Sequence, residues 1–115
     1  MVNFWATWCE PCVHELPSLQ RLADAYGADR LVVIAVNVKE PASRVSAFVR
    51  DQALTLPVVT DPDGRLTKRW DMRVFPATVL IGADGQPRQR LQGEVDWDSS
   101  ASRRWVDALF KKRRR

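Results

Sequence analysis

The chain has 115 residues, which is enough for one compact domain and too few for two. Hydrophobic residues make up 45% of it, an ordinary fraction for a globular protein, and no segment approaches the ~20 apolar residues that a membrane-spanning helix needs. The net charge of +4 comes from one end, since residues 1–102 carry 11 Lys and Arg against 13 Asp and Glu, whereas residues 103–115 carry seven basic residues and one acidic residue. The domain itself therefore offers no basic face for nucleic acid.

The hydrophobic pattern predicts alternating strands and helices. Residues 2–6 are an apolar run typical of a strand buried on both faces. Apolar residues recur at helical spacing over 11–26, and Gly27 is suited to ending that helix. The elements that follow, in chain order, are a strand over 31–37, a helix from Pro41, a short strand over 56–60, a helical turn over 66–70, strands over 77–81 and 87–92 that form a hairpin about Asp84-Gly85, and a last helix with its apolar stripe over 101–109.

The only two cysteines, Cys9 and Cys12, are separated by two residues, so they can close a small disulfide ring and reopen it by thiol exchange. Cys9 falls at a predicted helix N-terminus, where unpaired N–H groups and the helix dipole favour a thiolate. We therefore expect Cys9 to be the nucleophile and Cys12 the resolving thiol. Structural zinc needs about four ligands. Only these cysteines and His14 are near one another in the sequence, so we expect neither a metal nor a cofactor.

Three segments carry a resemblance to a known family: Val2-Asn3-Phe4-Trp5-Ala6-Thr7-Trp8-Cys9-Glu10-Pro11-Cys12, Glu15-Leu16-Pro17 and Val74-Phe75-Pro76-Ala77-Thr78. They resemble the thioredoxin superfamily, and within it the bacterial TlpA/ResA-like thiol:disulfide reductases. The resemblance implies an α/β fold, a thioredoxin-like three-layer α/β/α sandwich with a central mixed sheet. The first strand should lie in the centre, with the second on one side and the hairpin on the other. We expect this domain to cover residues 1–110, followed by a basic C-terminal tail over 111–115.

Members of this family usually carry an N-terminal segment ahead of the central strand, often with a signal or anchor. Here Met1 leads directly into that strand, so we expect an N-terminally truncated chain. Membrane contact is then expected only through the missing anchor or weakly through the basic tail. We expect a monomer, with a dimer through an exposed sheet edge as the alternative. The resemblance implies a periplasmic or extracytoplasmic location, on which the sequence itself is silent.

Glu15 is a candidate acid–base residue. It follows Cys12 by three residues and lies on the same helical face. In ResA-like proteins the matching glutamate is a buried acid that helps to move protons; the alternative is an exposed glutamate favoured by the helix dipole. Asn3 occupies the position where thioredoxin has a buried aspartate, so that helper is missing here.

Pro76 resembles the cis-proline of the family, which would bring a backbone edge beside the disulfide, where an extended substrate can pair. An ordinary trans proline is the alternative. Trp5 is as readily explained by the core as by the site, and His14 is expected to face solvent. The expected substrate-binding residues are Trp8, Glu10, Pro11, Val74, Phe75 and Pro76.

These features predict a thiol:disulfide oxidoreductase that mainly reduces protein disulfides and is reset by an upstream thiol reductant. By family analogy the substrates include apocytochrome c. A redox-linked binding module or metallochaperone that uses the groove beside Pro76 is the non-enzymatic alternative. A thiol peroxidase is less favoured, because such enzymes place Thr or Ser three residues before the reactive cysteine and Ala6 occupies that position.

Overall fold

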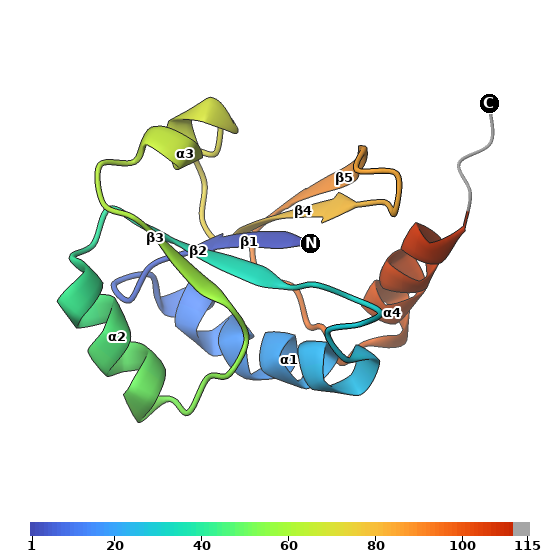
Figure 1. The fold of residues 1–115 in the computed structure, drawn as a ribbon, viewed down its shortest axis with the longest axis horizontal. Helices are drawn as coiled ribbons and strands as arrows, with labels where there is room; N and C mark the ends of the chain where they lie inside the picture. The colour runs from blue at the N-terminus through green and yellow to red at the C-terminus, as the bar shows by residue number, and fades with distance from the viewer. Residues whose placement is uncertain (112–115) are drawn as a thin grey trace.

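The structure, a computed structural model, describes residues 1–111. Apart from Lys111, the predicted basic tail lies outside the described residues. The five strands of the described structure are β1 (Val2–Trp5), β2 (Ile34–Val38), β3 (Val58–Asp61), β4 (Ala77–Ile81) and β5 (Pro87–Gln92). They form one sheet in the order β3-β2-β1-β4-β5 (Figure 1).

The first strand lies in the centre of the sheet, as the sequence predicts. β1 pairs in parallel with β2, and Val2 lies opposite Ile34. On its other side β1 pairs antiparallel with β4, and Asn3 lies opposite Thr78. The predicted hairpin of β4 and β5 completes that side of the mixed sheet.

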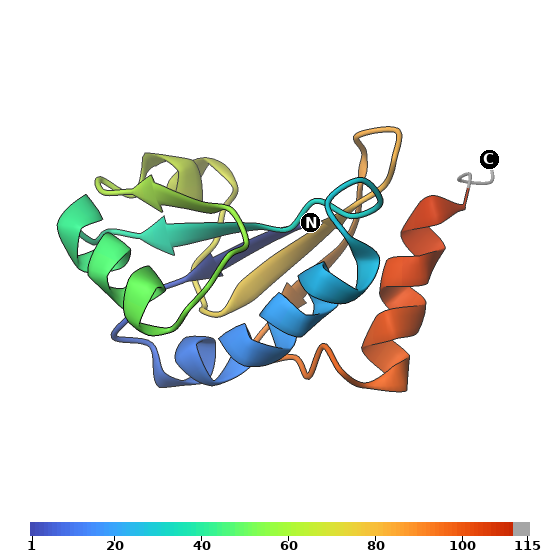
Figure 2. The same cartoon turned by 60° about the horizontal axis from the view of Figure 1, so that its bottom comes forward.

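Helices cover both faces of this sheet. They are α1 (Glu10–Tyr26), α2 (Ala42–Asp51), α3 (Arg65–Arg69) and α4 (Ser100–Asp107), which continues into a 3-10 turn over Ala108–Phe110. α1, α2 and α4 lie on one side and α3 on the other, as Figures 1 and 2 show together. The predicted three-layer thioredoxin-like architecture is thereby confirmed. Within residues 1–111, no helix is both long and apolar enough to cross a bilayer.

Successive side chains of β1 pack into separate hydrophobic cores on the two faces of the sheet. Trp5 is fully buried and joins the cluster beneath α1, which includes Leu19 and Trp97. Phe4 points to the other face, where it packs with Val36 and Met72. Successive side chains of a strand point to opposite faces, so this four-residue strand anchors both layers.

β2 begins later than the sequence predicts, at Ile34 instead of residue 31. The ladder with β1 begins only at that residue, although Leu31 and Val33 before it are buried. Val32 between them is 53% exposed, and its carbonyl accepts a hydrogen bond of 2.7 Å from the N-terminal ammonium group of Met1. The apolar run is therefore longer than the strand, because residues 31–33 lead into the sheet and are partly buried without belonging to the ladder.

α3 is only five residues long and is held at its start by Asp61. The buried Asp61 carboxylate accepts hydrogen bonds from the N–H groups of Leu66 (3.1 Å) and Thr67 (2.8 Å) and from the Thr67 hydroxyl (2.6 Å). Burial alone would raise the pKa of Asp61, but these hydrogen bonds hold it below its ordinary value. An ionised cap of this kind satisfies N–H groups that so short a helix cannot satisfy itself.

Candidate active site

The disulfide between Cys9 and Cys12 lies where β1 passes into α1. Cys9 is the residue that caps the helix N-terminus, and its carbonyl accepts a hydrogen bond of 3.1 Å from the N–H of Val13. A second bond of 3.2 Å, from the N–H of Cys9 to the carbonyl of Ala6, closes the turn before the helix. The Cα atoms of the two cysteines are 5.2 Å apart, and this is the oxidised state of the pair.

The two sulfur-bearing residues differ in how far they are covered. Cys9 is 6% exposed and Cys12 is 1% exposed. A reagent or substrate therefore approaches the pair from the side of Cys9. Both lie in the main core cluster, against which Phe75 also packs.

Glu15 is buried, with 1% of its surface exposed, so the exposed alternative is excluded. One carboxylate oxygen accepts a hydrogen bond of 2.8 Å from the amide of Asn3, and the other accepts one of 2.6 Å from the N–H of Val95. Burial raises the pKa of Glu15 to about 7, although these two hydrogen bonds lower it; the nearby charge of Glu94 raises it further. The carboxyl group therefore changes its charge near neutral pH.

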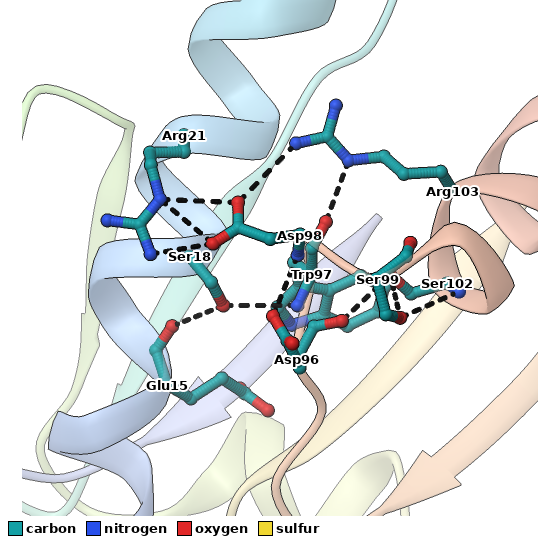
Figure 3. A network of polar contacts seen from close by, with 9 residues as sticks. All are labelled: Glu15, Ser18, Arg21, Asp96, Trp97, Asp98, Ser99, Ser102 and Arg103. Atoms are coloured by element: carbon teal, nitrogen blue, oxygen red, sulfur yellow. Dashed lines mark hydrogen bonds and ion pairs between the residues drawn. The ribbon is translucent and has the colours of Figure 1, made fainter.

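α1 also holds the loop over 93–99 that follows β5, as Figure 3 shows. The hydroxyl of Ser18 donates a hydrogen bond to the carbonyl of Glu15 (3.1 Å) and accepts one from the N–H of Trp97 (3.1 Å). One turn further along, the Arg21 guanidinium binds the Asp98 carboxylate, with distances of 3.0 and 2.7 Å to one oxygen. Glu15, Ser18 and Arg21 are spaced by three residues, so one face of α1 fixes the loop that supplies the Val95 N–H to the acid.

Glu40 is a second buried carboxylate near the site, and the sequence analysis missed it. It is 2% exposed and accepts hydrogen bonds from the N–H of Thr7 (2.6 Å) and the amide of Asn37 (2.9 Å), while its other oxygen accepts the Thr7 hydroxyl. Burial alone would raise the pKa of Glu40, but these bonds and the nearby Arg44 hold it below its ordinary value. Because Thr7 lies in the turn closed by Ala6 and Cys9, Glu40 fixes the turn that leads into the disulfide.

Of the residues expected to bind the substrate, some line one groove and others do not. The peptide bond between Phe75 and Pro76 is cis, as expected, and the Pro76 carbonyl accepts a hydrogen bond of 2.8 Å from Gly93. Trp8 is 64% exposed, and it lines the same groove as Phe75, about 560 Å³ in volume. Val74 is 52% exposed and does not line the groove. Glu10 and Pro11 are exposed on the first turn of α1.

The remaining aromatic and histidine predictions are resolved by burial. Trp5 is fully buried and belongs to the core. His14 faces solvent on α1, where its ring nitrogen contacts the Glu94 carboxylate. Trp97, which the sequence analysis passed over, is as buried as Trp5 and packs in the same cluster. Across residues 1–111 there is no group of three or more His, Cys, Asp or Glu side chains that could hold a metal ion.

Comparison with known proteins gives consistent matches. The model of the AhpC/TSA family matches residues 1–90. The thiol-disulfide oxidoreductase ResA of Geobacillus kaustophilus (strain HTA426) is 35% identical over 94 residues, which are 82% of this chain and 54% of ResA. The chain thus spans about half the length of the curated relatives it matches.

Solved structures agree with the fold. The crystal structure of StoA from Bacillus subtilis superposes with a TM-score of 0.76 at 29% identity, over 84% of this chain and 75% of StoA. A secreted disulfide oxidoreductase of Mycobacterium tuberculosis, homologous to E. coli DsbE, superposes with a TM-score of 0.79 at 26% identity, over 93% of this chain and 78% of that protein.

Proposed function

The chain belongs to the AhpC/TSA family, and its likeness to ResA confirms the expected TlpA/ResA-like resemblance; from this we propose that it is a thiol:disulfide oxidoreductase that reduces disulfides in other proteins. The observation that carries this proposal is the Cys9–Cys12 disulfide at the N-terminus of α1. A cysteine pair at such a position can pass between dithiol and disulfide, because a thiolate at a helix N-terminus is stabilised and can attack the disulfide of another protein.

The proposed reaction starts from the reduced pair. The Cys9 thiolate attacks one sulfur of a substrate disulfide, which forms a mixed disulfide and releases the other substrate sulfur as a thiolate. Cys12 then loses its proton and attacks the Cys9 sulfur, which re-forms the Cys9–Cys12 disulfide and releases the second substrate thiolate. Two electrons have passed to the substrate, and an upstream dithiol must return them to the pair.

Glu15 is the proposed acid–base residue of the second step. It shares a helical face with Cys12, and both are buried. With a pKa of about 7, its carboxylate form can accept the proton that Cys12 loses. The substrate would lie against Trp8, Glu10, Pro11 and the segment Val74-Phe75-Pro76. No step of this scheme uses a metal or an organic cofactor.

The names of the relatives support a more specific proposal for the location and the substrates of this chain. The M. tuberculosis oxidoreductase is a secreted protein, which supports an extracytoplasmic location for this chain. The likeness to the thiol-disulfide oxidoreductase ResA supports disulfides as substrates, and by the family analogy of the sequence analysis we propose that these include the disulfides of apocytochrome c. A peroxidase reaction is disfavoured because Ala6 lacks a hydroxyl and the Thr7 hydroxyl is already bound to Glu40.

The test is a redox titration of the purified protein in mixtures of reduced and oxidised dithiothreitol or glutathione. Trp8 is exposed beside Cys9, so tryptophan fluorescence should report the state of the pair. We expect one two-electron transition at a reducing potential, roughly −270 mV as in thioredoxin, which Cys9→Ser and Cys12→Ser both abolish. A midpoint near −120 mV, roughly that of the oxidant DsbA, would reverse the direction of the reaction. The absence of any transition would favour a binding module instead.

A further inference from the structure

The groove beside the disulfide is lined by both apolar and charged side chains. Trp8, which precedes Cys9, and Phe75, which precedes Pro76, both contribute to it. Val38 at the end of β2 and Met72 after α3 are buried and line it as well. The groove therefore extends from the redox pair toward α3, and a polypeptide whose disulfide reaches Cys9 lies next to it.

The charges of this groove are not balanced. Lys39 and Lys68 line it and are exposed, and within residues 1–111 neither has a carboxylate within the 4.0 Å of an ion pair. Both aspartates of the lining are instead paired with arginines: Asp63 with Arg65 at 3.5 Å and Asp71 with Arg73 at 3.0 Å. The groove thus presents two cations that no described carboxylate neutralises.

One of these cations, Lys39, packs its stem against a glycine of the groove lining. Lys39 has a φ of 55°, and its N–H donates a hydrogen bond of 2.9 Å to the carbonyl of Asp61. Its side chain runs along Gly64, where an added Cβ would come within 2.5 Å of the Lys39 Cε atom. Gly64, with a φ of 75°, leaves the space in which the Lys39 methylene groups lie. The stem of Lys39 therefore packs along Gly64, and its exposed side chain lines the groove.

We infer that this groove binds an acidic segment of the substrate polypeptide. Asp or Glu side chains next to the substrate disulfide contact Lys39 and Lys68, and a neighbouring apolar side chain packs on Val38 and Met72. This inference rests on the proposed oxidoreductase function and adds a substrate class to it. Ion pairs between exposed groups contribute little to equilibrium binding, but unbalanced charge beside a reactive centre speeds the encounter with an oppositely charged partner. The preference for acidic over basic substrates should therefore appear in kcat/KM and weaken as salt is added.

The test uses three peptides with the same disulfide loop, in which the flanking residues are all Asp, all Ser or all Lys. The fully reduced protein is mixed with each peptide at low and high salt, and the second-order rate constant of the single-turnover disulfide reduction, which corresponds to kcat/KM, is measured. We expect the Asp peptide to exceed the Lys peptide roughly tenfold at low salt, with the difference shrinking at high salt. Lys39→Gln/Lys68→Gln should bring the peptides close to equality, and Lys39→Glu/Lys68→Glu should invert the order.

The matched control is Arg104→Gln/Lys111→Gln, which also removes two positive charges, but from exposed positions near the C-terminal end of the chain that do not line the groove. This variant should keep the preference of the unmodified protein. Equal reduction of all three peptides, or a preference that survives Lys39→Gln/Lys68→Gln, would overturn the inference while leaving the oxidoreductase function intact. If not even the Ser peptide is reduced, the proposed function itself is wrong, and the inference fails with it.

Discussion

Glu15 combines complete burial with an ionisable group, so it couples the stability of the fold to pH. In the folded protein its pKa is about 7, whereas the ordinary value is 4.5. Between these two values the folded state holds a proton that the unfolded state has lost. Stability therefore falls as pH rises across this interval and levels off above the folded pKa.

Replacement of this residue gives the first prediction. Relative to Glu15→Gln, the oxidised wild-type protein should lose up to about 3 kcal/mol of unfolding free energy between pH 4.5 and pH 7. Urea unfolding at a series of pH values measures both proteins. Asp51→Asn, at an exposed position of α2, is the control and should follow the wild-type curve. Parallel curves for wild type and Glu15→Gln would show that Glu15 titrates alike in both states.

Short-range sequence patterns predict some site residues and miss others for a physical reason. Cys9, Cys12 and Pro76 could be placed because each lies in a local motif at an element boundary. Glu40 could not, because its contact with Thr7 spans 33 residues and arises only when β2 packs beside β1. A buried polar side chain whose partners are supplied by tertiary structure leaves no periodic signal in the sequence.

At the scale of elements, the contact between α1 and the loop over 93–99 determines the surroundings of the acid. Ser18 is the central member of this contact and is 7% exposed. Its hydroxyl is the hydrogen-bond partner of the buried Trp97 N–H. Loss of the hydroxyl would leave that N–H group without an acceptor, which is costly in a dry interior.

We predict that Ser18→Ala lowers the free energy of unfolding by about 1–3 kcal/mol. Amide hydrogen exchange should also quicken at Val95 and Trp97, because the loop opens more often. Ser46→Ala, on the exposed side of α2, removes a hydroxyl without these contacts and should leave both measurements near the wild-type values. Unchanged exchange at Val95 in Ser18→Ala would mean that the loop is held by other contacts.

The elements themselves could be predicted better than their ends. The hairpin strands are predicted at their observed bounds, because Asp84-Gly85 marks the turn between them. The strand predicted over 31–37 instead begins at Ile34 and ends at Val38. Apolar residues report burial, whereas a strand is defined by its ladder, and Leu31 is buried outside any ladder.

At the scale of the whole molecule, the sheet has two free edges among the described residues, β3 and β5. β3 has only four residues, and although its Val59 is 44% exposed, it ends at the capping carboxylate Asp61. β5 begins with Pro87 and carries Arg88 and Arg90. Short length, proline and charge all disfavour pairing of edges between chains.

We therefore predict a monomer, in preference to the alternative of a dimer through a sheet edge. Light scattering coupled to size exclusion should give a mass near 13.1 kDa at every loading concentration. A mass that rises toward twice this value as concentration increases would establish edge pairing. In that case Val59→Lys should restore the monomer, because a lysine on the edge opposes pairing.

The order of the sheet also decides when the redox centre comes into being during biosynthesis. β1 is central, yet Asn3 meets Thr78 across a separation of 75 residues, and Val95 emerges later still. A ribosome adds roughly 5–20 residues per second, so several seconds pass between the exit of Cys9 and that of the residues that enclose it. During that time the two cysteines are ordinary thiols on a nascent chain, open to any oxidant in the compartment. The two thiols of a newly made chain can thus be oxidised before the chain can act as a catalyst.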